Sequence, residues 1–344
     1  MMSALFGAVE SGVIYAIMAL GVYLSFRILD FPDLTVDGSF VTGAAIAAIL
    51  IVNGTNPFFA TLIAIGAGFL AGCVTGLLHT KGKINPLLAG ILMMIALYSI
   101  NLRIMGRSNV PLLNEESIFT KVEEVFSTLG IESLMNSIAS AIGLGSITST
   151  WSILISMILL TTIIKVLTDF FLRTQVGLAL RATGDNKRMI RSFSANTDQL
   201  TILGLGISNA LVALSGALIA QYSSFADVGM GIGMIIIGLA SVIIGEAIFG
   251  TKTIAVTTFA VIGGAVVYRL VVSLALRVDF LETGDMKLIT AIIVIGALIF
   301  PQLIDGQKER NRKKRKRLQQ EMKLKELQDG GKDYASSKSD SQSV

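Results

Sequence analysis

Long runs of apolar side chains are the feature that most limits how this chain can fold. A helix needs about 20 predominantly apolar residues to cross the hydrocarbon core of a bilayer. Candidate runs cover residues 4–26, 38–52, 57–79, 86–104, 151–172, 200–221, 231–249, 254–276 and 287–303. Because backbone polar groups inside a bilayer must be satisfied within each span, the sequence predicts an all-α, polytopic membrane helical bundle of about nine transmembrane helices.

The composition supports a membrane protein and excludes several kinds of site. Charged residues make up 15% of the chain, whereas soluble domains usually carry about 25%. The chain has one cysteine, Cys73, and one histidine, His79. A single cysteine cannot form an internal disulfide, and one histidine does not make a His-rich metal site. We therefore expect no metal bound by this chain.

The basic residues of the loops predict which end of the bundle faces the cytoplasm. Short loops rich in Lys and Arg stay inside, and the run KERNRKKRKR follows the last apolar run. With that tail inside, the other inner segments hold Arg27, Lys81, Lys83, Lys252 and the stretch from Arg173 to Arg191. The long segment 105–150 then lies outside and is acidic, with Glu115, Glu116, Glu123, Glu124 and Glu132 against Arg107 and Lys121. The predicted topology is N-out and C-in.

Two regions follow from this reading. Residues 1–305 form the transmembrane domain, with an outer loop at 105–150 and an inner polar segment at 173–199. Residues 306–344 form a basic, polar cytoplasmic tail. A basic cluster directly inside a membrane span attracts anionic lipid headgroups, so we expect membrane lipids and no nucleic acid as its partner.

Small residues mark one helix for close packing. Within 57–79, Ala60, Ala64, Gly68, Gly72 and Gly76 recur every four positions. Such a ridge lets the backbone of a second helix approach closely. The sequence therefore predicts a tight helix–helix seam along this span.

The inner segment GLALRATGDNKRMIRSFSANT is polar and basic, although apolar runs flank it on both sides. It is longer than the usual connection between bundle helices. Asp185 or Asn186 is available as the N-cap of a short helix, with Gly184 breaking the chain just before it. An ordinary connecting loop is the alternative interpretation.

The residues of this segment resemble those of a known family. Gly177, the pair Arg181-Ala182, Gly184 and Asn186, followed by LTILGLGISNALVALSGAL, are similar to permease subunits of ABC importers of the branched-chain amino acid and ribose type. DGSFVTGA and IIIGLASVIIGEAIFG also resemble the second span and a late span of that family. The resemblance covers most of residues 5–305 and points to the branch labelled tryptophan or tyrosine transport permeases.

The resemblance implies a function, a set of partners and a location. The chain would be a multi-pass permease of the bacterial cell membrane that moves a small solute, such as an amino acid, delivered by an extracytoplasmic solute-binding protein. It would pair with a second copy of itself and with an ATP-binding cassette ATPase subunit, which holds the ATP and Mg. The permease itself binds no cofactor. The polar segment would dock into the ATPase subunit through Gly177, Arg181, Ala182, Gly184, Asp185, Asn186, Lys187, Arg188 and Arg191.

Carboxylates near the second span form a further candidate site. RILDFPDLTVDGSF places Asp30, Asp33 and Asp37 around Pro32. Ionisable groups at membrane depth are costly and usually face a cavity or a partner, and Pro32 and Gly38 would interrupt a helix. Asp33, Asp37, Gly38 and Phe40 are therefore candidates for the substrate pathway. The alternative is a solvated inner loop in which Arg27 pairs with one of the acids.

Two further acids lie in apolar helix, and neither spacing suggests a catalytic pair. Glu10 is expected near the outer surface. Glu246 is expected at an inner gate, where it pairs with Lys252 or contacts the partner subunit. The stretch Gly245–Thr253 does not form a phosphate-binding loop, because Thr251 separates Lys252 from the second glycine. We therefore expect a transport subunit without its own ATPase site.

Two rival functions come from other classes. An ion-coupled secondary transporter would use Asp33, Asp37 or Glu10 for protons or sodium, but no inverted repeat is visible in the hydropathy. An intramembrane enzyme would need a nucleophile with its base or a metal site, and neither arrangement is present in the sequence.

Overall fold

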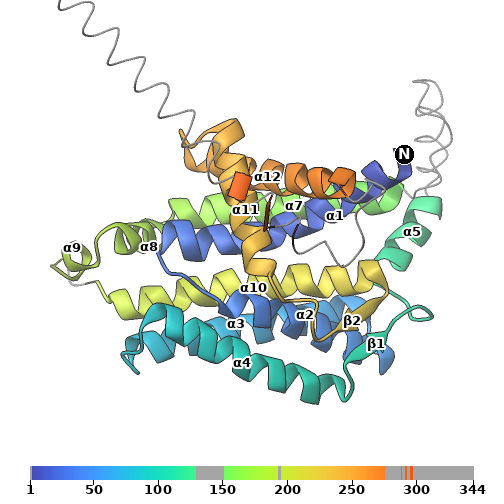
Figure 1. Ribbon diagram of the computed structural model, residues 1–344, viewed down its shortest axis with the longest axis horizontal. Helices are drawn as coiled ribbons and strands as arrows, with labels where there is room; N and C mark the ends of the chain where they lie inside the picture. Colours follow the sequence, from blue (N-terminus) through green and yellow to red (C-terminus); the bar gives the residue numbers. More distant parts are fainter. Residues whose placement is uncertain are drawn as a thin grey trace, which may run out of the picture. The chain divides into compact units, whose positions relative to one another are not determined.

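The computed structural model describes residues 2–128, 151–192 and 195–275, together with residues 288, 291, 292, 295 and 296. Most of these residues are helical (Figure 1). Seven helices are long and apolar enough to cross a membrane. They are α1 (Met2–Val22), extended by the π-helix η1 (Tyr23–Ile28), α2 (Thr35–Val52), α3 (Pro57–Thr80), α4 (Pro86–Met105), α7 (Trp151–Arg173), α10 (Thr197–Ser223) and α12 (Ile254–Ala275).

The shorter elements connect these helices. They are α5 (Ile118–Thr128), α8 (Gln175–Asp185), α9 (Lys187–Ser192), α11 (Met234–Phe249) and the strands β1 (Asn109–Pro111) and β2 (Phe225–Asp227). The predicted polytopic helical bundle is confirmed, but the run 231–249 is not a full-length span. Its helix has 16 residues, because residues 228–233 form turns and Gly233 has a φ of 88°. The predicted span 287–303, apart from five residues, and the tail 306–344 lie outside the described residues.

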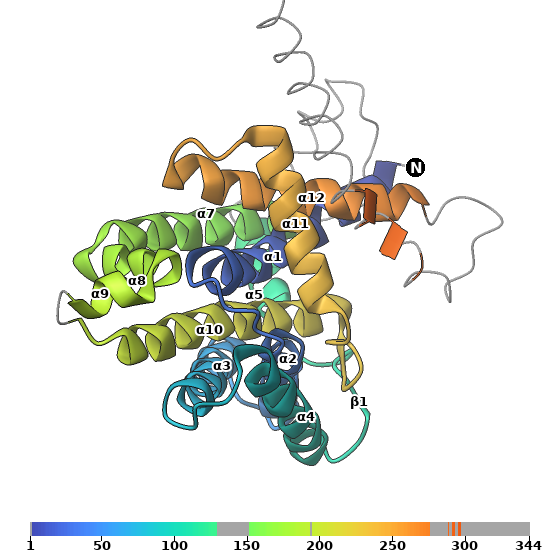
Figure 2. The same ribbon diagram turned by 60° about the vertical axis from the view of Figure 1, so that its left-hand side comes forward.

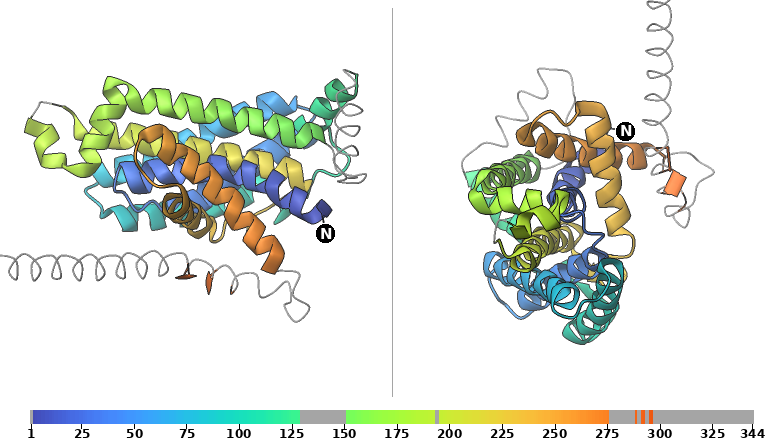
Figure 3. Two further views of the ribbon diagram at one scale, coloured as in Figure 1. Left: turned by 90° about the horizontal axis from the view of Figure 1, so that it is seen from above. Right: turned by 90° about the vertical axis from the view of Figure 1, so that its left-hand side faces the viewer.

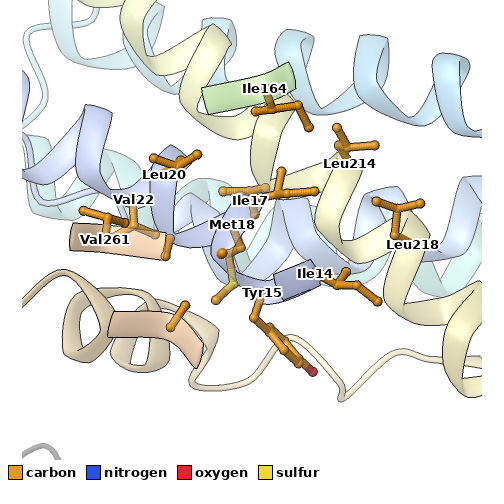
Figure 4. Packing of buried hydrophobic residues seen from close by; sticks show 14 of the residues in the cluster. Ile14, Tyr15, Ile17, Met18, Leu20, Val22, Ile164, Leu214, Leu218 and Val261 are labelled. Carbon is orange, nitrogen blue, oxygen red and sulfur yellow. The ribbon is translucent and has the colours of Figure 1, made fainter. Parts of the chain in front are cut away.

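Helix α1 lies in the centre of the main hydrophobic core. Between Val13 and Leu24 nearly every side chain is buried, so the helix is apolar on all its faces. Figure 4 shows Ile14, Ile17 and Leu20 with side chains of three other helices, Ile164 of α7, Leu214 of α10 and Val261 of α12. A helix that is hydrophobic all round is buried within a larger bundle, and this explains why α1 lacks a polar face.

The predicted small-residue seam is confirmed, and its partner is α10. Figures 1 and 2 show α10 between α1 on one side and α2 and α3 on the other. A Cβ atom added to Gly68, Gly72 or Gly76 would meet atoms of Asn209, Leu205 or Ile202 respectively, and the first two contacts include backbone carbonyls. Only residues without a side chain let the two backbones come this close.

A small antiparallel sheet ties together two segments that are far apart in the sequence. Asn109 pairs with Asp227, and Pro111 pairs with Phe225. An all-helical prediction does not contain these strands, because three-residue strands leave no periodic signal. The pairing places the chain that follows α4 and the chain that follows α10 at the same end of the bundle.

Helix α11 crosses the long helices instead of running along them (Figures 1 and 3). It begins beside Asp37 of α2, packs at Gly238 against Val22 of α1, and ends with Glu246 beside Arg27. Its second neighbour is α12, whose Ala260 carbonyl would meet a Cβ on Gly245. α11 therefore connects the interior of the bundle with the end where η1 lies.

Candidate functional site

The inner polar segment folds as two short helices, α8 and α9, and each start is capped by a side chain. Thr174 Oγ1 accepts a hydrogen bond from Gly177 N at 3.2 Å. Asn186 Oδ1 accepts one from Met189 N at 3.1 Å. The backbone of Asn186 is extended, with φ −153° and ψ 90°, and this separates the two helices. The sequence offered Asp185 or Asn186 as the cap of a short helix; the cap is Asn186, and a longer helix, α8, precedes it.

The predicted role of Gly184 as a chain break was wrong. Gly184 lies within α8, and a Cβ atom at this position would meet the carbonyl of Ile28 and the backbone of Leu29. Gly177 likewise lies against the backbone of Phe171 and Leu172 at the end of α7. Gly177, Leu180 and Gly184 recur at helical spacing, so they form the face by which α8 packs on the bundle. The glycines allow close approach and do not form a turn.

The polar side chains of the segment point away from this packed face. Arg181, Asp185, Asn186 and Arg188 are exposed. Arg191 differs from them, because its guanidinium donates to Thr197 Oγ1 at 3.0 Å and its NH2 group lies 3.4 Å from Asp198 Oδ1. Arg191 therefore holds α9 against the start of α10, whereas Arg188 makes no ion pair among the described residues.

A polar cleft of about 750 Å³ opens beside α8. Its walls are η1, α8, the end of α11 and the turn that precedes α12. The charged residues that line it are Arg27, Asp30, Arg181, Asp185, Glu246 and Lys252. One cleft thus contains Arg181, Ala182, Gly184 and Asp185 of the predicted docking segment and Glu246 of the predicted inner gate, which were predicted from the sequence as separate sites.

The sequence predicted that Glu246 would pair with Lys252 or contact the partner subunit. In the structure Glu246 pairs with Arg27. Arg27 Nε and Nη2 each donate to one carboxylate oxygen at 3.0 Å. The side chain of Glu246 is 15% exposed and that of Arg27 is 62% exposed. Arg27 also does not pair with Asp30, Asp33 or Asp37, because the π-helical turn places it toward α11. A planar guanidinium with two parallel hydrogen bonds fixes both partners in orientation, so this pair fastens η1 to the end of α11.

Asp33 lies inside the bundle. The chain leaves η1, and Asp30 adopts a φ of 51°, which is uncommon for a residue other than glycine. Residues 29–34 are not helical and lead back among the helices. Asp33 is fully buried, with Oδ1 accepting from Thr35 N at 2.9 Å and Oδ2 accepting from Asn209 Nδ2 at 2.7 Å. Asn209 lies near the middle of α10, so this carboxylate fastens the re-entering chain to the central helix.

Asp37 caps α11 from a different helix. Its two carboxylate oxygens accept hydrogen bonds from Gly233 N at 2.9 Å and from Ile235 N at 2.8 Å. No side chain of α11 itself caps that end. A carboxylate at a helix N-terminus satisfies free N–H groups and complements the helix dipole. The solvated-loop alternative does not describe Asp37, which is fixed to a helix end.

Gly38 and Phe40 are buried in α2. The prediction that Gly38 would interrupt a helix was wrong, because Gly38 lies within α2. It lies against Leu97 of α4, and its carbonyl accepts from Asn101 Nδ2 at 3.1 Å. The ring of Phe40 stacks on Tyr15, with centroids 6.0 Å apart. A pathway role for Asp33, Asp37, Gly38 and Phe40 stays a prediction.

Arg269 of α12 is a half-buried charged residue that was not predicted from the sequence. Its guanidinium carbon lies 3.9 Å from the centroid of the Tyr15 ring. Nearby, Glu10 Oε2 accepts from the hydroxyl of Tyr222 at 2.9 Å. A usable signal was present, because an arginine inside the predicted span 254–276 is an ionisable group at membrane depth.

Comparison with known proteins identifies the family. Residues 4–300 match the family described as branched-chain amino acid transport system / permease component. The tyrosine transport system permease protein of Clostridioides difficile is 43% identical over 312 residues, covering 91% of this chain and 96% of that protein. The uncharacterized protein RP368 of Rickettsia prowazekii is 35% identical, covering 86% and 97%. The ribose import permease protein RbsC of Escherichia coli is 24% identical, covering 70% and 68%.

These matches extend over nearly the whole transmembrane domain, including the α8–α9 segment. They agree with the multi-pass helical bundle of the structure. The family is a transport component of the bacterial plasma membrane and not an enzyme. It excludes the secondary transporter and the intramembrane enzyme that the sequence had left as rivals. The chain therefore belongs to the branched-chain amino acid transport system permease family and is the permease subunit of an ABC-type transport system.

Proposed function

We propose that this permease imports an amino acid. A binding protein outside the cell delivers the substrate, and a separate ATPase subunit, which binds the ATP and Mg, drives the transport. Support for an amino acid substrate comes from the relative named as a tyrosine transport permease, which is 43% identical over almost the full length of both chains. Two copies of the permease and two ATPase subunits complete the proposed importer.

The proposed orientation is N-out and C-in. The β1–β2 pairing joins the ends of α4 and α10, and the acidic helix α5 follows β1. The opposite end carries the cleft with Arg27, Arg181 and Lys252 and the basic residues of α9. Basic loops remain in the cytoplasm, so this end faces inward and the β1–β2 end faces outward.

The α8–α9 segment carries the proposed contact with the ATPase subunit. One observation supports this most directly. One face of the segment is packed on the bundle, while the other face is polar and exposed, and the starts of both helices are capped. Gly177, Leu180 and Gly184 hold the inner face. Arg181, Asp185 and Arg188 are exposed on the other face. A connecting loop does not need two capped helices, whereas a surface that a soluble partner grips and releases does need a fixed shape.

Two contacts would transmit movement of this segment to the pathway. α8 lies against the backbone of Ile28 and Leu29, and η1 is joined to α11 by the Arg27–Glu246 pair. The start of α11 is in turn capped by Asp37 of α2, and Phe40 of the same helix stacks on Tyr15. A displacement of α8 by the ATPase subunit would therefore reach the helix end that Asp37 caps.

The experiment that tests this proposal reverses one exposed charge. Arg188→Glu changes the exposed face of α9 and breaks no ion pair among the described residues, unlike a change at Arg191. The matched control is Arg107→Glu, an exposed arginine at the opposite end of the bundle. Both variants should insert and purify normally, because both side chains are exposed.

We expect Arg188→Glu to reduce recovery of the ATPase subunit and coupled uptake in proteoliposomes on the order of tenfold. The loss should depend on salt, because exposed charges are screened over about 8–10 Å. Arg107→Glu should retain both properties. Normal ATPase recovery and normal coupled uptake for Arg188→Glu would show that α9 is an ordinary connection.

A further inference from the structure

Three helices bring a carboxylate, an arginine and two tyrosines together near the end of the bundle where β1 and β2 lie. Glu10 and Tyr15 belong to α1, Tyr222 to α10 and Arg269 to α12. Gly12, between the two α1 residues, lies against Arg269, since a Cβ on Gly12 would sit 3.4 Å from the Arg269 Cβ. Tyr222 is within electrostatic range of both Glu10 and Arg269. The two opposite charges therefore occupy one region of the bundle.

The contacts leave one acceptor and one donor unused. Tyr222 bonds Oε2 of Glu10, while Oε1 is buried and has no hydrogen-bond partner among the described residues. Glu10 as a whole is 5% exposed. Nε of Arg269 is likewise buried and without a partner in the described part of the chain. A buried polar atom that lacks a partner is costly, and a charged one more so.

The contact of Arg269 with Tyr15 does not occupy the N–H groups of the guanidinium. Tyr15 lies under the face of the guanidinium, and a cation–π contact uses only that face. The N–H groups lie in the guanidinium plane, where they can bind a carboxylate through two parallel bonds. Figure 4 shows the Tyr15 side chain directed away from Ile164 and Leu214, which pack on the other side of α1. Tyr15 is itself buried in the main core, so it holds Arg269 in a fixed position.

The two charges do not pair with each other among the described residues, where the ion pairs are Arg27–Glu246, Lys121–Glu116, Lys165–Asp169 and Arg191–Asp198. The Lys165–Asp169 pair shows how the fold treats a charge pair that is purely structural. Its atoms are 2.6 Å apart, and Thr258 supplies a further hydrogen bond to Asp169. Glu10 and Arg269 are nearby but unpaired, and each keeps an unused atom. A zwitterion would supply both missing partners, with its ammonium for Glu10 and its carboxylate for Arg269.

We propose that Glu10 and Arg269 form a receiving site for the α-ammonium and α-carboxylate groups of an amino acid, at the end of the permease that faces the binding protein. Tyr222 and Tyr15 position the two charged side chains. This inference rests on the proposed function and adds the residues that recognise the substrate class. The site would bind the α-ammonium and α-carboxylate groups, which all α-amino acids share, and would not contact the side chain of the substrate.

The experiment measures which charge of the ligand each residue recognises. The full-length permease is reconstituted in liposomes, and binding of radiolabelled L-tyrosine is measured by equilibrium dialysis. Tyramine, which lacks the carboxylate, and 3-(4-hydroxyphenyl)propionate, which lacks the ammonium, serve as competitors. The wild type should bind L-tyrosine at least about tenfold more tightly than either analogue, because each analogue forfeits one charge-assisted contact.

Each variant should lose one of these preferences. Glu10→Gln should bind L-tyrosine no better than the propionate, while its preference over tyramine persists. Arg269→Gln should bind L-tyrosine no better than tyramine, while its preference over the propionate persists. Glu10→Asp and Arg269→Lys should restore part of the lost preference. A structural defect would weaken all three ligands together and would not give this crossed pattern.

Controls separate the site from the proposed function. Arg103→Gln and Glu116→Gln alter exposed residues near the same end and should keep wild-type preferences. Uptake from a loaded binding protein is measured with the ATPase subunit in parallel liposomes. Unchanged preferences in both test variants, or no saturable binding by the wild type, would overturn the receiving site. Amino acid uptake in that case would leave the proposed function standing, whereas its absence would count against both.

Discussion

The α3–α10 seam and the α8–α9 segment both pack closely through glycines, but they differ in what remains exposed after packing. In the seam, Gly68 and Gly72 bring one backbone against another, and the facing surface belongs to α10 of the same chain. In α8, Gly177 and Gly184 bring the helix against the backbone of α7 and of the chain after η1. The remaining face of α8 and α9 is polar and exposed, with Arg181 and Arg188.

The comparison shows that close packing alone does not distinguish a structural helix from a docking one. Both surfaces of the seam belong to this chain, so a change there should affect folding. Only one face of the α8–α9 segment packs on this chain, so a change there should affect the partner that contacts its exposed face.

Gly72→Leu should have the largest effect. Its side chain would enter the space occupied by the backbone of Leu205, and overpacking of this kind costs about 3 kcal/mol or more. We expect loss of monodisperse protein on size-exclusion chromatography after membrane extraction. Gly66→Leu is the matched control on the same helix, since no atom lies within 4 Å of a Cβ at that position. Equal behaviour of the two variants would show that the seam does not need close approach.

Gly184→Ala should damage docking more than folding. The added methyl group meets the carbonyl of Ile28, so α8 must shift, at a cost of about 2 kcal/mol for local repacking. The permease should still insert, while recovery of the ATPase subunit falls. Co-purification from membranes measures this, with Gly66→Ala as the control. A normal yield of the complex would mean that the position of α8 is not critical for docking.

Asp37→Asn should have a moderate effect. The amide keeps one acceptor oxygen but places an NH2 group against the second backbone N–H at the start of α11. We expect about 1 kcal/mol lower stability, measured by the temperature at which the detergent-extracted protein loses its chromatographic peak. Coupled uptake decides the pathway hypothesis: a loss of transport far beyond the loss of stability supports it. Loss of stability with normal uptake would leave Asp37 as a helix cap only.

Removal of the Arg27–Glu246 pair should have the smallest effect on stability. The pair is partly exposed at Arg27, and exposed ion pairs contribute less than about 1 kcal/mol. Arg27→Gln, Glu246→Gln and the double variant together give the coupling energy between the two side chains. We expect the single and double variants to lower coupled uptake to a similar extent, because either change releases η1 from α11. Additive losses would show that the two residues act separately.

The sequence was sufficient for features that repeat along one element. The four-residue spacing of small side chains in α3 predicted the seam, since residues i and i+4 lie on one helix face whatever the partner is. The cap at Asn186 was also local, because a side chain of this kind bonds the N–H groups that follow it directly. The basic and polar character of residues 173–199 likewise follows from composition alone.

The site could not be predicted where its partners are distant in the sequence. Arg27 and Glu246 are 219 positions apart, and by sequence alone the nearer Asp30 and Lys252 were equally suitable partners. The shortened α11 escaped detection because apolar Met and Ile residues surround the glycines that form its preceding turn. Hydropathy measures the transfer of side chains from water and carries no information on where a backbone turns.

What the sequence determined by itself is the class of protein: apolar runs long enough to span a bilayer, a seam of small residues, and a polar inner segment of family character. What only the tertiary structure decided is the assignment of each charge. Asp33 meets Asn209, Asp37 meets the start of α11, Glu246 meets Arg27, and Glu10 and Arg269 face the same region without pairing. The physical reason is one of range. Burial and helical periodicity act over a few neighbouring residues, whereas a charge at membrane depth is satisfied by whichever group the packing of other helices brings within about 3 Å.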